Sequence, residues 1–171
     1  MASELHIQAL DKSLHDRASF DCGVSALNNY LAKQARKEVE SSCCVCLVAT
    51  DDPNSKSVMG YYTLSSASII RTALPEKITK KLPRYKDLPA TLLGRLAVDK
   101  NYQGQRIGGR LLFSAMRRAF EASEEVASWA LVTDPKDEDA RNFYKKFGFL
   151  DLDTQRMFIP MKEVEDLINA R

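Results

Sequence analysis

Hydrophobic residues change their spacing along the chain, and the changes predict where strands and helices lie. Apolar and polar residues alternate over 5–10, whereas Val24, Leu27, Leu31 and Ala35 recur at the spacing of one helix face. Apolar runs predict strands over 5–10, 43–50, 58–70, 91–98, 128–133, 149–152 and 155–161. Helical spacing predicts helices that begin near residues 24, 76, 107, 138 and 162.

The order of these elements predicts the fold class. Strands that can form hairpins come first, and a strand–helix–strand unit follows from residue 91. This order predicts an α/β (α+β mixed) fold, with a mixed, mostly antiparallel sheet of six to seven strands flanked by helices on both faces. A length of 171 residues predicts a single domain over 1–171 with a sizeable core.

Composition narrows the classes of protein and site. A hydrophobic share of 44% and a charged share of 28% are ordinary for a globular protein. No apolar run is long enough to cross a bilayer, and the N-terminal residues lack a signal pattern, so we expect a cytoplasmic protein with no membrane partner. The four cysteines, Cys22, Cys43, Cys44 and Cys46, have no second ligand cluster, so we expect buried free thiols and no metal.

Two features indicate contacts with phosphate. In residues 96–112 an apolar strand enters a glycine-bearing turn that opens into a helix, and a helix start offers unpaired N–H groups to a pyrophosphate. The residues after Gly108-Gly109 are not the Lys-Ser/Thr of a nucleotide P-loop, and the glycine spacing does not fit a dinucleotide-binding loop. Residues 71–88 carry six basic and two acidic side chains, which makes them a candidate polyanion surface or an ordinary solvated face.

The glycine loop resembles the coenzyme A loop of the GNAT acetyltransferase superfamily, Gln/Arg-x-x-Gly-x-Gly/Ala. Gln103, Arg106 and Gly108 occupy its positions, and Arg106 replaces the central glycine. If Arg106 has ordinary helical dihedrals, the replacement costs little and its guanidinium adds a contact to phosphate. The resemblance implies acetyl-CoA as cofactor, a binding core at about 90–150, and contacts from Leu96, Ala97, Val98, Gln103, Gly104, Gln105, Arg106, Ile107, Gly108, Gly109 and Arg110.

A second motif runs from Ala140 to Phe149 and resembles the GNAT signature Ala-x-x-Phe-Tyr-x-x-x-Gly-Phe. Tyr144 is the catalytic candidate, because a tyrosine with a pKa of about 10 is protonated at neutral pH and can give its proton to a departing thiolate. The alternative is a core tyrosine beside Phe143 and Phe147. Asn142 is a further candidate contact to the pantetheine or phosphate arm of coenzyme A. Tyr144 is also a candidate contact to coenzyme A.

The N-terminal segment from Phe20 to Leu31 resembles a Phe-x-Cys/Ser-Gly-x-x-x-Leu-x-x-Tyr/Trp-Leu pattern of GNAT toxins from type II toxin–antitoxin modules. This resemblance implies acetylation of the α-amino group of aminoacyl-tRNA and a block of translation. It also implies a ribbon-helix-helix antitoxin partner, DNA contact only through that antitoxin, and a homodimer. The candidate tRNA contacts are Arg71, Lys80, Lys81, Arg84, Arg95, Arg141 and Lys145.

The acceptor chemistry agrees with this interpretation. An α-amino group next to an ester is less basic than a free one with a pKa of about 7.7–8, so it needs no strong base at neutral pH. A lysine acceptor with a pKa of about 10.4 would need one, and no carboxylate near the two motifs stands out. Two other hypotheses stay open: a GNAT enzyme for a small amine or a protein N-terminus, and a non-catalytic acetyl-CoA-binding regulatory module.

Overall fold

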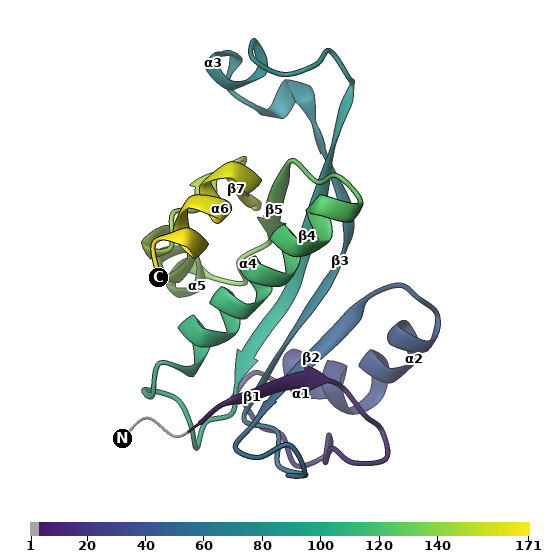
Figure 1. The fold of residues 1–171 in the computed structure, drawn as a ribbon. Coiled ribbons are helices and arrows are strands. Elements are labelled where there is room, and N and C mark those ends of the chain that lie inside the picture. Colours follow the sequence, from purple (N-terminus) through teal and green to yellow (C-terminus); the bar gives the residue numbers. More distant parts are fainter. Residues whose placement is uncertain (1–3) are drawn as a thin grey trace. The chain divides into compact units, whose positions relative to one another are not determined.

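The computed structural model describes residues 4–171, and seven strands form one sheet (Figure 1). The strand order is β1-β2-β3-β4-β5-β7-β6, with β4 and β5 parallel and the pairs β1–β2, β2–β3, β5–β7 and β6–β7 antiparallel. This confirms the predicted mixed, mostly antiparallel sheet. The strands are β1 (His6–Ala9), β2 (Val45–Thr50), β3 (Gly60–Ile70), β4 (Asp87–Val98), β5 (Ala130–Thr133), β6 (Leu150–Asp151) and β7 (Met157–Pro160).

The helices begin close to the predicted positions, with one difference in the first. The pattern from Val24 predicts one regular helix, but the structure has α1 (Ser25–Asn29), a π-helical turn (Tyr30–Gln34) and α2 (Ala35–Glu40). A π-helical turn inserts an extra residue into the helix, and the spacing of apolar residues in the sequence does not reveal it. The remaining helices are a 3-10 turn (Arg71–Ala73), α3 (Glu76–Thr79), α4 (Ile107–Glu125), α5 (Glu138–Lys146) and α6 (Met161–Asn169).

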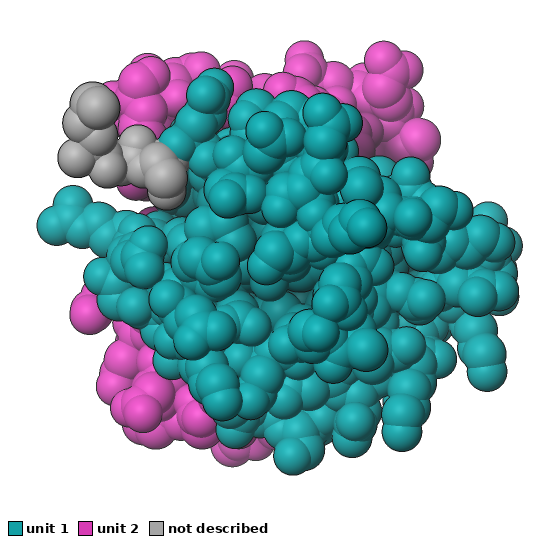
Figure 2. Space-filling model, turned by 90° about the horizontal axis from the view of Figure 1, so that it is seen from below, with its two compact units in different colours: residues 1–65, 94–115 teal, residues 66–93, 116–171 magenta. Residues whose placement is uncertain are grey.

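The chain divides into two compact units, coloured separately in Figure 2. Unit 1 comprises residues 1–65 and 94–115, and its core contains Phe20, Tyr30, Leu31, Val48 and Tyr61. Unit 2 comprises residues 66–93 and 116–171, and its core contains Ile69, Leu74, Leu88, Val132 and Phe158. β3, β4 and α4 each have residues in both units. A single domain over 1–171 stays a prediction.

Within unit 1, helix α4 packs closely against the strands at Gly60. A Cβ atom added at Gly60 would lie 2.8 Å from Cδ1 of Leu111 and 2.9 Å from the carbonyl oxygen of Ala97. Both distances are shorter than van der Waals contact, so only glycine allows this approach without a shift. Gly60 therefore sets how closely the first turns of α4 lie to the end of β4.

The cysteine expectation is only partly correct. All four thiols are free, but Cys43 is exposed because it lies in the turn before β2 begins at Val45. Cys46 is buried, and this burial raises the pKa of its thiol to about 12, so it stays protonated. Among residues 4–171 no three His, Cys, Asp or Glu side chains group as metal ligands. Within the same residues, every helix is too short or too polar to span a bilayer.

Candidate functional site

The turn between β4 and α4 occupies the position that the glycine motif predicts. β4 ends at Val98 and α4 begins at Ile107, so residues 99–106 connect a strand end to a helix start in unit 1. The register of β4 with β5 runs from Ala90 to Leu93, and β4 continues beyond it. The backbone of Leu96, Ala97 and Val98 therefore lies past the paired residues, where an amide-containing ligand can add to the strand.

Two residues of the turn adopt left-handed backbone conformations. Gly104 has φ +81° and Arg106 has φ +62°. The condition under which arginine costs little here, ordinary helical dihedrals, is not met, because Arg106 has a left-handed conformation that glycine adopts freely and that is unfavourable for other residues. A left-handed L residue costs about 1 kcal/mol or more, and the surrounding structure must offset that cost. The positive φ at this position explains why the GNAT loop pattern has glycine there.

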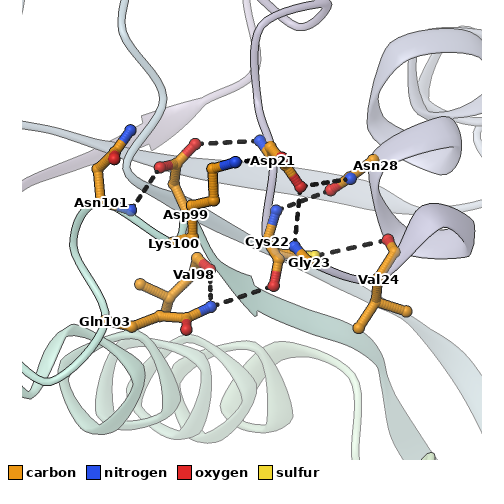
Figure 3. A network of polar contacts seen from close by, with 10 residues as sticks. All are labelled: Asp21, Cys22, Gly23, Val24, Asn28, Val98, Asp99, Lys100, Asn101 and Gln103. Atoms are coloured by element: carbon orange, nitrogen blue, oxygen red, sulfur yellow. Dashed lines mark hydrogen bonds and ion pairs between the residues drawn. The ribbon is translucent and has the colours of Figure 1, made fainter.

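A buried aspartate organises the turn from within. Asp99 is 6% exposed, and its carboxylate accepts hydrogen bonds from the backbone N–H groups of Asp21, at 3.0 Å, and Asn101, at 2.9 Å. The Asp99 backbone carbonyl also accepts from the N–H of Tyr102 at 2.9 Å. One side chain thereby joins the turn to the segment around residue 21 (Figure 3).

Gln103 strengthens the same connection from the other side of the turn. Its Nε2 donates to the carbonyl oxygens of Val98, at 2.9 Å, and Cys22, at 3.1 Å. The side chain predicted as a cofactor contact is thus engaged with the backbone of its own loop and of the N-terminal segment (Figure 3). Gln103 therefore ties the turn to the end of β4 and to the N-terminal segment.

The N-terminal segment is itself tied together by Asp21 and Asn28. Asp21 Oδ1 accepts from the N–H of Gly23 and from Nδ2 of Asn28, both at 2.9 Å, and Lys100 Nζ lies 2.9 Å from Asp21 Oδ2. These contacts, led by Lys100, lower the pKa of Asp21 to about 2. Asp21 is therefore a carboxylate throughout the neutral pH range, and its contacts with Gly23, Asn28 and Lys100 do not change with pH there.

The first turn of α4 completes the cradle. Ile107 is buried, Gly108 and Gly109 are half-buried, and Arg106 and Arg110 are exposed together with Gly104 and Gln105. The first N–H groups of a helix have no intrahelical acceptor, and the helix dipole places partial positive charge beside them. A glycine turn, open N–H groups and two arginines fit a pyrophosphate, so the residues present suit the coenzyme A of an acetyl donor.

Replacing Arg106 separates its backbone strain from its charge. We expect Arg106→Gly to stabilise the protein by about 0.5–1 kcal/mol, because relief of the left-handed strain outweighs the added freedom of the unfolded chain. Arg106→Ala is the matched control: it removes the guanidinium, keeps the strain and leaves stability unchanged. Urea unfolding measures stability and calorimetry measures acetyl-CoA affinity. Equal stability of the glycine variant and the parent would contradict the strain at this position.

Tyr144 lies in unit 2, on α5. Asp137 caps this helix by accepting the N–H of Ala140 at 2.8 Å, and Gly148 ends it with φ +96°. Tyr144 is 6% exposed, and its ring centroid lies 5.2 Å from that of Phe143 and 5.3 Å from that of Phe149. Burial raises the pKa of Tyr144, and the hydrogen bond with the Thr133 side chain opposes this only in part. The phenol is therefore protonated at neutral pH.

The other candidates on α5 divide into exposed and engaged side chains. Asn142 is exposed. Arg141 forms an ion pair with Asp151 and donates from Nη2 to the carbonyl oxygen of Thr154 at 2.9 Å, while Lys145 Nζ lies 3.7 Å from Asp151 Oδ2. Arg141 thus fastens α5 to the segment around β6, and much of its charge is used inside unit 2.

Arg95 is also engaged within the fold. Its guanidinium carbon lies 3.5 Å from the ring centroid of Tyr30 in unit 1, a cation–π contact. The Tyr30 phenol donates to a carboxylate oxygen of Glu38 and lies 3.4 Å from the Cys44 sulfur. Tyr30 is 2% exposed, and its burial raises the pKa of the phenol. Arg95 is half-buried, so only part of this cation faces solvent.

The basic segment 71–88 contains α3 and lies in unit 2. Arg71 is half-buried and donates from Nη1 and Nη2 to the carbonyl oxygens of Pro83 and Thr79. Lys80, Lys81 and Arg84 are exposed. The predicted tRNA contacts therefore differ in kind: Arg71 shapes the segment and the other three present charge to solvent.

Sequence reasoning missed Asp99 and Asn28, whose contacts hold the cofactor turn. The available signal was the motif from Phe20 to Leu31, which carries Asp21, Cys22 and Asn28 but gives no indication of its distant partner. Asp99 follows the strand directly, at a position where any polar residue would suit a turn.

Comparisons with known proteins match most of the chain. The sequence model of the acetyltransferase (GNAT) family matches residues 16–149. The chain is 28% identical over 176 residues to "Probable toxin TacT" of Sinorhizobium fredii, covering 98% of this chain and 97% of the relative. It is 31% identical over 155 residues to the "tRNA-acetylating toxin" of Mycobacterium tuberculosis, covering 90% of each chain.

Two solved structures are similar over the same extent. The structure of AtaT complexed with acetyl-methionyl-tRNAfMet has a TM-score of 0.87 and 34% identity, covering 96% of this chain and 99% of that one. The structure of a mutant AtaT toxin bound to the C-terminus of the antitoxin AtaR and acetyl-CoA has a TM-score of 0.80 and 29% identity, covering 95% and 97%.

Proposed function

Because this chain belongs to the acetyltransferase (GNAT) family, we propose that it acetylates the α-amino group of the amino acid on aminoacyl-tRNA and acts as a toxin that blocks translation. The chain is an N-acetyltransferase that uses acetyl-CoA. The acceptor is supported by one observation above all: the similarity to a tRNA-acetylating toxin covers 90% of this chain and 90% of the relative.

The cofactor is held by the backbone rather than by long side chains. The N–H groups at the start of α4 and the turn at 103–106 bind the pyrophosphate, with Arg106 and Arg110 beside it. The open backbone of Leu96 to Val98 binds the amide-bearing arm as an added strand and presents an N–H group to the thioester carbonyl. When bound, acetyl-CoA supplies the acetyl group to be transferred.

The reaction then needs a free amine and one proton. The α-amino group of an aminoacyl ester is less basic than a free α-amine, whose pKa is about 7.7–8, so a large fraction is unprotonated at neutral pH. Tyr144 holds the proton that the departing thiolate requires, because burial keeps its phenol protonated. The attacking nitrogen loses one proton as it becomes an amide, and this proton restores the phenol. Asn142, at the preceding exposed position of α5, hydrogen-bonds the same arm of the cofactor.

The proposed partners are a tRNA, an antitoxin and a second copy of the chain. The exposed side chains of Lys80, Lys81, Arg84 and Lys145 contact the tRNA backbone. Arg71, Arg95 and Arg141 are engaged within the fold and contribute only the part of their charge that reaches solvent. An antitoxin of the ribbon-helix-helix type neutralises the protein and supplies its contact to DNA. Solved structures of similar toxins support an antitoxin partner, because they include AtaT bound to the C-terminus of the antitoxin AtaR and a KacTA–DNA complex. The protein forms a homodimer, acts in the cytoplasm, and comprises one domain over 1–171.

An acetyl-transfer assay with total charged tRNA tests the function. Radiolabelled acetyl-CoA is incubated with charged tRNA, with the same tRNA after deacylation, and with free amino acids. Label that enters only the charged tRNA, and is released with its amino acid by mild base, is the expected result. Label in free amines or in protein N-termini instead, with none in tRNA, would replace the proposed acceptor. Absence of acetyl-CoA binding would exclude transfer altogether.

A further inference from the structure

The connection between β3 and β4 forms a closed arm, defined here as residues 71–86. The N–H of Arg71 donates to the carbonyl oxygen of Lys86 at 2.9 Å, which joins the two ends of the arm. Figure 1 shows the arm, with α3 in it, beyond the far ends of β3 and β4. Both ends of the arm and its interior belong to unit 2.

The arm is held in shape from inside. The Arg71 guanidinium donates to the carbonyl oxygens of Thr79 and Pro83, and to that of Leu82 at 3.5 Å. Within the arm, the side chains of Leu74 and Thr79 are buried. A cation shared among three carbonyls makes a defined surface out of a segment whose regular structure is a 3-10 turn (Arg71–Ala73) and the four-residue helix α3.

On this defined surface, Tyr85 is 65% exposed, the second most exposed large hydrophobic side chain of the described residues. It stands between Arg84 and Lys86, both exposed, and the arm also carries Lys77, Lys80 and Lys81 to solvent. The fold does not use the Tyr85 ring for its core. An accessible aromatic face among cations is the combination that binds unpaired nucleotides, because bases stack on the ring while phosphates pair with the charges.

We propose that Tyr85 stacks on an unpaired base of the tRNA, and that Arg84 and Lys86 contact the phosphates on either side of it. This inference rests on the proposed function, since it concerns the same substrate. Charge complementarity selects a polyanion, and the ring selects its single-stranded part, because bases inside an A-form duplex present no open face. Stacking tolerates every base, so this contact strengthens binding without selecting a sequence.

Binding of labelled tRNA across a series of salt concentrations tests the stack, using full-length protein with Tyr85→Ala, Tyr85→Leu and Tyr85→Phe. We expect the alanine and leucine variants to bind about tenfold more weakly at every salt concentration, with the salt dependence unchanged. The phenylalanine variant keeps the ring and binds within about twofold of the parent. Arg84→Gln is the matched control, because loss of one phosphate contact makes the salt dependence shallower by about 0.7–0.9.

Each other outcome overturns the inference. Equal affinity of the alanine variant and the parent would show that the ring does not touch the tRNA. A phenylalanine variant as weak as alanine would assign the effect to the hydroxyl rather than to stacking. If Tyr85→Ala weakened binding to a blunt-ended RNA duplex as much as binding to tRNA, the ring would not be stacking on an unpaired base. Binding to anionic lipid vesicles that depends on Tyr85, with tRNA affinity unaffected, would assign the arm to a membrane surface.

The transfer assay on the parent protein keeps this result separate from the proposed function. If the parent acetylates charged tRNA while Tyr85→Leu binds it normally, the stack fails and the function stands. If the parent transfers no acetyl group to charged tRNA, the function fails. A thermal unfolding midpoint is recorded for each variant, and the leucine side chain preserves apolar bulk if alanine disturbs the arm.

Discussion

Replacing Tyr144 with phenylalanine is expected to lower kcat by about 10²–10³-fold and to leave the Kd for acetyl-CoA within about twofold, because the change removes one proton donor from the transition state. The aromatic packing against Phe143 and Phe149 does not involve the hydroxyl, so the variant keeps its fold. Single-turnover transfer to charged tRNA gives the rate, and calorimetry gives the affinity.

Controls for this prediction come from the same helix and from pH. Phe143→Leu alters the neighbouring ring and retains the phenol, so we expect it to change kcat much less than the Tyr144 variant. The raised pKa of Tyr144 also predicts no loss of kcat from phenol ionisation as the pH rises through 9. Full activity of Tyr144→Phe would return the residue to a packing role.

Neutralising Lys80, Lys81 and Arg84 together to glutamine has the second large expected effect. We expect tRNA affinity to fall by about 10- to 100-fold at low salt, and the slope of log affinity against log salt to become shallower by about 2, as three lost contacts require. The three side chains are exposed on a segment that Arg71 holds, so their replacement leaves that segment in place. Filter binding across salt concentrations measures both quantities.

The matched control changes the same net charge elsewhere. Lys56, Arg118 and Lys162 are also exposed, and their replacement by glutamine should leave the salt slope within error of the parent. A slope that moves equally in both triple variants would mean that net charge, rather than the arm, governs binding. An unchanged slope in the Lys80, Lys81 and Arg84 variant would identify these residues as an ordinary solvated face.

The strand and helix order could be predicted because apolar spacing reports burial directly. The strand that leads into the glycine turn, the helix after it and the Asp137-capped helix α5 all lie where their patterns place them. Each is specified by neighbours within a few residues, which a single sequence displays.

Features that depend on distant partners could not be predicted in the same way. Asp99 is an ordinary turn residue in the sequence, and only the fold brings the N–H of Asp21 to its carboxylate. Arg106 has a positive φ, a conformation that an arginine in the sequence does not indicate. The sequence also does not show which basic side chains face solvent, because Arg71 and Arg141 donate hydrogen bonds to carbonyl oxygens within unit 2.

The missing side chain at Gly60 links stability to donor affinity without any contact to the ligand. Its bare α-carbon lets Leu111 of α4 and the Ala97 carbonyl of β4 both lie close to β3 at Gly60. In the proposed function, α4 offers its first N–H groups to the diphosphate and β4 offers its edge to the acyl arm. A methyl group at Gly60 would spread them apart, so a random-mutagenesis screen for weak acetyl-CoA binders should recover this remote position alongside the loop itself.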